Sequence, residues 1–341
     1  MGKSGKPRRE TFKCEILTPM FCGGADPQKA ELRASSVKGV LRFWWRALHG
    51  HLPLSELRKQ EGQIFGSTEG IGKSKVLLSV EADLQPCTDP FPKHNIRVTS
   101  KSKTFPVNIL DYLCYGTYTW NREKRTNEFV KSYLKQGEWF KLHIVYPDTC
   151  EKQILDALYM LVNFGGLGAC SRNGFGSAHI NDPRLSIEPV NFLKQLNSPA
   201  SPVDYSALSS GLRLFRTRKL HGTWDSALAE LGIAYRVARG SLEPKHEFKR
   251  RKYVASPLIA EKKTHSDIAR RAKPYFMHVA RVGDEFEGRI LYLPAAFCAG
   301  LSKDSKNNII DQNKHNEMNK EFASVCADMN NQLADKLEVV L

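Results

Sequence analysis

The chain has 341 residues, of which 41% are hydrophobic, including 17 Phe, 11 Tyr and 5 Trp. This content supports packed cores and excludes a disordered protein, while the length favours two domains. The formal net charge of +15 favours a polyanionic partner, nucleic acid before an anionic membrane. No stretch approaches the roughly 18 uninterrupted apolar residues that a membrane span requires, so we expect no membrane partner.

The N-terminal segment MGKSGKPRRE is predicted to be a loose basic tail over residues 1–10. It leads into a strand without the apolar region of a secretory signal, so we expect a cytoplasmic location. TFKCEILTP alternates apolar and polar residues, which is typical of a half-buried strand ended by Pro19. After a long loop, SSVKGVLRFWWRALHGH predicts a helix with Ser35 or Ser36 at its N-cap and Gly50 at its end.

This first helix has two contrasting faces. The candidate core face carries Val37, Val40, Leu41, Trp44 and Leu48. The opposite face is basic and carries Lys38, Arg42, Trp45, Arg46 and His49. A cationic stripe beside an exposed tryptophan suits contact with an RNA backbone together with base stacking, although such faces are usually only solvated. We therefore take four of its members as candidate RNA contacts: Lys38, Arg42, Trp45 and Arg46.

Strand-like segments recur at 75–82 and 139–147, and the polar, irregular stretch between them, about 85–137, is predicted to be an insertion. Residues 150–166 then place apolar side chains at helical spacing. A glycine-rich loop, GGLGACSRNGFGS, follows and leads into a short closing strand, SAHI. The order strand, helix, strand, strand, helix, strand predicts a split βαβ, or ferredoxin-like, domain over 11–184.

After a linker containing Pro and Ser at 197–206, a similar order of elements returns less clearly. We predict a strand in GLRLFRTRKL, a helix in TWDSALAELGIAYRVAR, a strand pair in PYFMHVARV and EFEGRILYLP, and a long helix near the C-terminus. The second half has no glycine loop in its sequence. The fold class is therefore predicted to be α+β, a tandem of ferredoxin-like (βαββαβ, RRM-like) domains in which the second, 185–341, is degenerate.

The glycine loop at 165–177 holds five glycines, a density that indicates close approach of the backbone to something. It follows a helix and precedes a strand, the reverse of a dinucleotide fingerprint, and the sequence has no P-loop motif, so we expect no cofactor. We predict a cradle for RNA phosphate, with Arg172 on the phosphate, Asn173 on a base or sugar, and Phe175 as a stacking face or, alternatively, a core plug. The candidate contacts are Gly166, Gly168, Arg172, Asn173, Gly174, Phe175 and Gly176.

A third cationic stretch, KHEFKRRKY at 245–253, continues to residue 274. It adds Arg250 and Arg251 as candidate RNA contacts, the alternative being a disordered basic loop. The eight cysteines form no C-x-x-C pair and are expected to be buried, reduced thiols. Because the acids near the first helix are also dispersed, we predict no metal site.

Three stretches resemble one family. GLGACSRNGFG (166–176) resembles the glycine loop of the repeat-associated mysterious proteins, the RAMP superfamily of CRISPR systems. TPMFCGGADPQKAELRASSVKGVLRFWWRAL (18–48) and RRAKPYFMHVARVGDEFEGRILYLP (270–294) are similar to blocks of the first-subunit family of the Cmr complex, type III-B. Two features differ: the loop carries one Arg where relatives often carry more cations, and the insertion matches no segment of the family.

The resemblance implies two ferredoxin-like domains and a place in a ribonucleoprotein that uses a CRISPR guide RNA against invading single-stranded RNA. It also implies a subunit near the 3′ end of the guide, with target cleavage in a different, backbone subunit. We therefore expect a non-catalytic RNA-binding subunit whose partners are guide RNA, target RNA and other Cmr subunits, including the RAMP backbone subunit.

Two alternatives remain. The first is a metal-independent CRISPR RNA endonuclease of the RAMP type, with His49 or His51 as its acid–base group. The second is a DNA-binding module, for which the sequence offers neither a helix-turn-helix nor a zinc pattern. Incubation of the protein with repeat RNA in EDTA would separate the endonuclease from the binding subunit.

Overall fold

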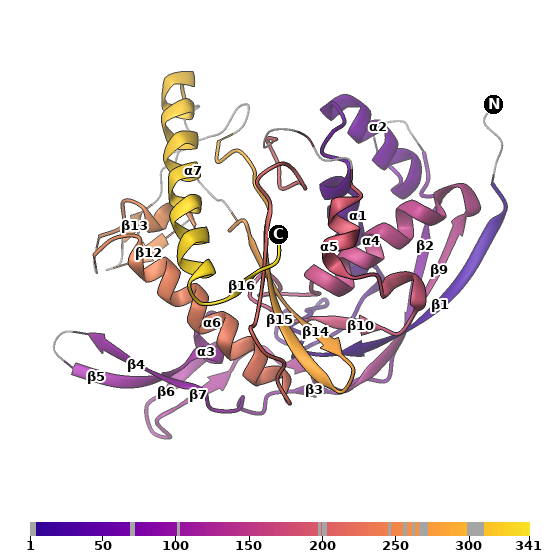
Figure 1. Cartoon of the computed structure of the whole chain (residues 1–341). Helices are drawn as coiled ribbons and strands as arrows, with labels where there is room; N and C mark the ends of the chain where they lie inside the picture. Colours follow the sequence, from indigo (N-terminus) through magenta and orange to yellow (C-terminus); the bar gives the residue numbers. More distant parts are fainter. Residues whose placement is uncertain are drawn as a thin grey trace.

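The computed structural model describes residues 5–68, 72–100, 103–196, 199, 203–244, 247–254, 258–260, 263–265, 272–298 and 310–341. This part of the chain forms two four-stranded antiparallel sheets, each packed against helices (Figure 1). The prediction of an α+β fold is confirmed. Five of the ten residues of the predicted linker at 197–206 lie outside the described residues.

The first sheet has the order β10-β1-β9-β2. Its strands are β1 (Pro7–Ile16), β2 (Leu77–Glu81), β9 (Trp139–Pro147) and β10 (Ala178–Ile180). Two helices pack against each other beside it, namely α1 (Ala34–Leu48) and α4 (Glu151–Phe164). Counted along the chain, the strand order is 4-1-3-2 with a helix after the first and the third strand, which agrees with the predicted order of elements.

The second sheet has the order β14-β15-β11-β16. Its strands are β11 (Arg213–Arg216), β14 (Tyr275–Val282), β15 (Glu285–Tyr292) and β16 (Glu338–Val339). Helices α6 (Trp224–Ser241) and α7 (Gln312–Ala334) pack against each other beside it. Read from the β16 edge, this order is again 4-1-3-2. The closing strand has two residues, which fits the expectation of a less regular second half.

Two predicted boundaries are wrong. Residues 7–10 belong to β1 and are not a loose tail, because they pair with β9 and Arg8 Nη1 lies 2.7 Å from a carboxylate oxygen of Glu151. Helix α1 begins at Ala34, before the predicted N-cap serines, and its C-cap is His49 instead of Gly50.

The insertion at 85–137 is regular, contrary to prediction. It contains β3 (Pro86–Cys87), β4 (Asn95–Ser100), β5 (Lys103–Asn108), α3 (Ile109–Leu113), β6 (Tyr118–Asn121), β7 (Thr126–Phe129) and β8 (Tyr133–Leu134). The pairs β4–β5 and β6–β7 are hairpins, and α3 packs on α6. The insertion therefore packs on the second half of the chain, across the predicted domain boundary, which stays a prediction.

The sequence did not lead us to predict α2 (Leu54–Phe65), which packs against α1. The other α-helix and strands that the structure describes are short: α5 (Pro189–Lys194), β12 (Leu258–Ala260) and β13 (Lys263–His265). Three short 3-10 helices are also present: η1 (Asp148–Cys150), η2 (Pro183–Leu185) and η3 (Arg251–Tyr253).

The buried side chains form two clusters. One joins the first sheet, α1 and α4 to one face of the second sheet at Leu214, Phe276 and Leu291, and the other joins the second sheet to α6, α7 and the insertion. The glycine loop contributes to both, because Leu167 belongs to the first cluster and Phe175 to the second. The loop thus lies where the two halves meet.

The eight cysteines remain thiols and six of them are buried, as predicted. Burial raises the pKa of Cys14 and Cys22 to about 12. Among the helices that the structure describes, none is both long and apolar enough to cross a bilayer.

Candidate nucleic-acid interface

The last glycines of the loop hold conformations that side chains rarely adopt. Gly174 and Gly176 have φ angles of +87° and +71°. A Cβ atom on Gly174 would collide with the Leu228 side chain on α6, and one on Gly176 with the carbonyl oxygen of Leu167. The close approach that the glycines permit is therefore made to the protein itself.

The backbone N–H groups at these glycines also bond within the protein. The N–H of Gly174 donates to the carbonyl of Ser171 (3.2 Å), and the N–H of Gly176 donates to that of Pro19 (2.9 Å). The prediction that the amides of these two glycines are left for a phosphate is therefore wrong.

Phe175 is a core residue and not a stacking face. Its exposed fraction is 0%, and its ring centroid lies 5.4 Å from that of Phe91 and 5.6 Å from that of Phe21. The core-plug alternative is confirmed. The first glycines serve the same packing, since a Cβ on Gly166 would lie 2.6 Å from the carbonyl oxygen of Phe175, and one on Gly168 would lie 2.5 Å from that of Phe21.

Asn173 connects the loop to the insertion. Its side-chain nitrogen donates to the carbonyl oxygen of Leu113 at the end of α3, 2.5 Å away. The amide nitrogen that we expected on a base or sugar is therefore held by the protein, because the end of α3 lies beside the loop.

Strand β14 fixes the other side of the loop. The N–H of Met277 donates to the carbonyl of Arg172 (3.2 Å), and Nδ1 of His278 lies 2.7 Å from the carbonyl oxygen of Gly165. Burial lowers the pKa of His278 to about 3, so the ring is neutral at physiological pH. Because a carbonyl only accepts, Nδ1 carries the proton.

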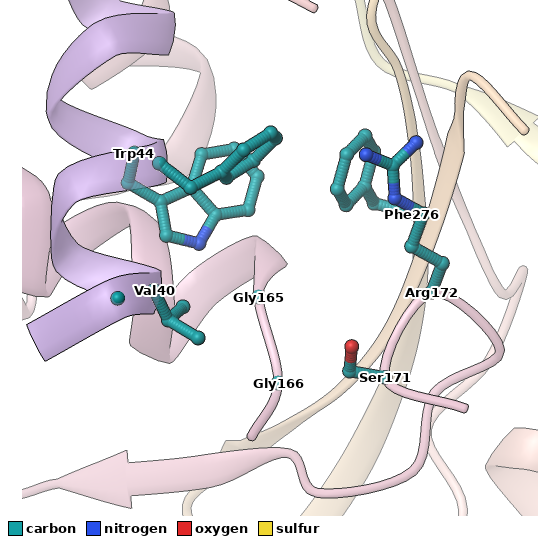
Figure 2. Close-up of a pocket in the computed structure, with 9 residues that line it drawn as sticks. Val40, Trp44, Gly165, Gly166, Ser171, Arg172 and Phe276 are labelled. Atoms are coloured by element: carbon teal, nitrogen blue, oxygen red, sulfur yellow. The ribbon is translucent and has the colours of Figure 1, made fainter. Parts of the chain in front are cut away.

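The side chain of Arg172 extends from the loop to a pocket. Its Nη1 donates to the carbonyl of Lys273, and its guanidinium lies 4.3 Å from the ring centroid of Phe276 and 5.6 Å from that of Phe43. Figure 2 shows the space between Trp44 on α1 and the pair formed by Arg172 and Phe276.

Two adjoining pockets share Phe43 and Arg172. One has a volume of about 150 Å³ and is also lined by Gly39, Val40, Trp44, Gly165, Gly166, Ser171 and Phe276. The other has a volume of about 330 Å³ and is also lined by Arg46, Asp204, Tyr205, Ser206 and Ala272. Together they form a groove between α1, the glycine loop and β14, which we call the α1 groove.

The basic residues of α1 are partly exposed but have partners. Arg42 Nε and Arg46 Nη1 each lie 2.6 Å from the same carboxylate oxygen of Glu61 on α2. Two guanidinium groups on one carboxylate leave one excess positive charge on this side of α1, where Arg46 lines the groove together with the carboxylate of Asp204. Lys38 Nζ donates to Ser74 Oγ (2.7 Å), and burial, followed by the charge of Arg42, lowers its pKa.

The prediction of an exposed Trp45 is wrong, because α2 covers that side of α1. Trp45 has an exposed fraction of 0%, with its ring near Phe65 and stacked on His49 at 4.1 Å. The aromatic ring on the open face is Phe43, which is partly exposed. The sequence pattern that could have identified Phe43 is the i, i+4, i+7 spacing of Gly39, Phe43 and Arg46, which places the three residues on one helical face.

His49 has a structural position at the end of α1. Its Nδ1 lies 2.7 Å from the carbonyl oxygen of Trp45, and burial lowers its pKa. His51 is exposed, and the two imidazole centroids are 5.9 Å apart.

The third cationic stretch is ordered where the structure describes it, so the disordered-loop alternative is wrong for 247–254. Arg250 pairs with Asp328 (2.8 Å) and Glu321 (3.2 Å) on α7, and Arg251 Nε pairs with Glu243 (3.1 Å). These carboxylates tie the segment to the end of α6 and to α7. Contact of Arg250 and Arg251 with RNA stays a prediction, and most of 255–271 lies outside the described residues.

Comparison with known proteins agrees with the resemblance seen in the sequence. Residues 13–179 match the model of the RAMP superfamily. The chain is 32% identical over 182 residues to the CRISPR system Cmr subunit Cmr1-2 of Pyrococcus furiosus, covering 50% of this chain and 93% of that relative. The chain belongs to the Cmr1 family of the RAMP superfamily.

Two further matches concern this Cmr1-family chain. It is 30% identical over 178 residues to the CRISPR system Cmr subunit Cmr1-1 of the same organism. This match covers 50% of the chain and 44% of that relative. The crystal structure of Cmr1 from Pyrococcus furiosus in its apo form superimposes with a TM-score of 0.56 at 18% identity, covering 98% of both chains. The fold is therefore shared along the whole chain.

Proposed function

We propose that this chain is a non-catalytic RNA-binding subunit of a type III-B CRISPR (Cmr) ribonucleoprotein, built from two ferredoxin-like domains in tandem. The 4-1-3-2 strand order in both sheets supports the tandem architecture. The names of the relatives, both Cmr subunits, support membership of the complex. The partners are then the guide RNA, single-stranded target RNA and the other Cmr subunits, including the RAMP backbone subunit.

The observation that carries the RNA-binding role is the α1 groove. Phe43 supplies partly exposed ring surface beside the Arg172 guanidinium, which itself packs on the buried ring of Phe276. Arg46 lines the second pocket, with Asp204 as the one acidic residue among the described lining. Rings beside cations are the combination with which proteins hold single-stranded RNA, since bases stack and phosphates attract the charge. In this proposal Arg172 acts from the groove, while the glycines and Phe175 hold the loop in shape.

A non-catalytic role agrees with the position of the histidines. His49 is bonded to the α1 backbone and stacked on Trp45, so its structural place as a C-cap accounts for it. General acid–base cleavage of RNA needs a second positioned group beside the first. His51 remains the candidate of the endonuclease alternative.

RNA titrations of groove variants test the proposal. We expect Phe43→Ala with Arg46→Ala to weaken binding of a fluorescent single-stranded RNA of about 20 nucleotides by tenfold or more, since stacking contributes roughly 1–3 kcal/mol per base. Lys320→Ala, which removes an exposed charge on α7, is the control and should bind like the wild type. Unchanged affinity of the Phe43 and Arg46 variant would refute the α1 groove as the RNA site.

A further inference from the structure

The insertion exposes an unusual row of aromatic side chains. Tyr115 is 83% exposed and Trp120 is 58% exposed. Tyr118 lies between them, with its ring 6.4 Å from that of Tyr115, and it shares one face of β6 with Trp120 because alternate residues of a strand point the same way. We call Tyr115 and Trp120 the aromatic surface of the insertion.

This surface stands on a rigid base. The ring of Tyr118 packs on Phe129 (6.3 Å), Phe129 packs on Phe91 (4.8 Å), and Phe91 packs on Phe175 of the glycine loop (5.4 Å). The side chain of Asn127 on β7 also donates to a carboxylate oxygen of α3 at 2.7 Å. A chain of rings thus joins the surface to the centre of the molecule, which lowers the ordering cost of binding.

The charge of the insertion selects a polyanion. Residues 85–137 contain nine Lys and Arg against four Asp and Glu. Arg122 and Arg125 are exposed in the turn of the β6–β7 hairpin, close in sequence to Trp120. Exposed rings and arginines are also common at protein–protein interfaces, so it is the net positive charge of the insertion that favours nucleobases attached to phosphates as the occupant.

The surface is also next to the glycine loop. Leu113, two residues before Tyr115, accepts the hydrogen bond from Asn173. The insertion also meets the loop through Phe91, whose ring centroid lies 5.4 Å from that of Phe175. The α1 groove borders the same loop from its other side.

We infer that the insertion is a second contact for single-stranded RNA, at which bases stack on Tyr115 and Trp120. This inference rests on the RNA-binding function proposed above and extends the RNA path from the α1 groove across the glycine loop. Figure 1 shows the β4–β5 and β6–β7 hairpins beside α6, away from α1, so the two contacts are separate.

Binding of single-stranded RNA to ring variants of the full chain tests the inference. Tyr115→Ala with Trp120→Ala is expected to weaken binding of an RNA of about 20 nucleotides by at least about fivefold for each ring. Tyr115→Phe with Trp120→Phe keeps the stacking faces and should bind within about twofold of the wild type. Trp139→Ala, at an exposed ring on β9 outside the insertion, is the control. Thermal melting of each variant checks the fold.

Wild-type affinity of the double alanine variant overturns the inference, as does an equal loss in Trp139→Ala. Retained RNA affinity with lost co-purification of the other Cmr subunits also overturns it and makes the surface a protein-docking site. The groove variant Phe43→Ala with Arg46→Ala separates the two proposals. Loss only in the groove variant refutes the insertion contact alone, whereas loss only in the insertion variant refutes the α1 groove alone.

Discussion

Replacement of Phe175 by Ala distinguishes a core plug from a stacking face. The ring has an exposed fraction of 0% and packs on Phe21 and Phe91, which belong to the same buried cluster. Removing a fully buried Phe side chain costs about 3–5 kcal/mol. Because the neighbours are held by the glycine loop and the insertion, we expect little collapse into the cavity and a value near the upper end.

Urea unfolding followed by fluorescence measures this loss as a change in the free energy of unfolding. Phe175→Leu, which keeps most of the apolar volume, should lose about 1–2 kcal/mol and serves as the graded variant. Val282→Ala, at a 39% exposed position of β14, is the surface control and should change stability by less than about 0.5 kcal/mol.

RNA affinity of folded Phe175→Leu should equal that of the wild type, since the ring contacts protein only. Unchanged stability together with a tenfold loss of RNA affinity in this variant would refute the core-plug assignment. It would also restore the stacking role that the sequence suggested.

Three further predictions concern other parts of the molecule. Glu61→Gln removes the carboxylate shared by Arg42 and Arg46, so RNA affinity should rise. The logarithm of the binding constant should also fall more steeply with the logarithm of the salt concentration, by roughly 0.7 for each additional phosphate contact. An unchanged slope contradicts the role of this pair. Repeat RNA incubated with the protein in EDTA should stay intact on a denaturing gel. Cleavage by the wild type that is lost in His51→Ala would instead establish the endonuclease alternative. The pKa of His278 falls from 6.5 in the unfolded chain to about 3 in the fold, so the unfolded chain takes up a proton that the folded chain does not. Stability should therefore decrease as the pH falls from about 6.5 towards 3, and His278→Gln should weaken this dependence, whereas an identical pH profile would contradict it.

The order of elements could be predicted from the sequence because it is written in local patterns. The predicted strand at 139–147 coincides with β9, since its buried residues alternate with exposed ones along its length. The apolar spacing of 150–166 likewise predicted α4. Both signals depend only on residues within one element.

The site could be predicted less well, because it depends on contacts between elements distant in sequence. The sequence suggested an exposed Trp45, although Trp45 lies one helical turn from Leu41 and so shares its side of α1. No local pattern showed that α2 would cover the neighbouring face and bring Glu61 to Arg42. The same holds for Asn173, whose partner lies sixty residues earlier in the chain. Phe43 was overlooked because its neighbours Arg42 and Trp44 have the stronger sequence signals.

Photocrosslinking tests the central claim, that RNA lies in the α1 groove, most directly. Single-stranded RNA carrying 4-thiouridine is bound to the full chain and irradiated, and the linked peptides are identified by mass spectrometry. We predict crosslinks to peptides of α1 that contain Phe43 and to peptides of the glycine loop that contain Arg172. Crosslinked RNA with neither peptide modified would contradict the claim.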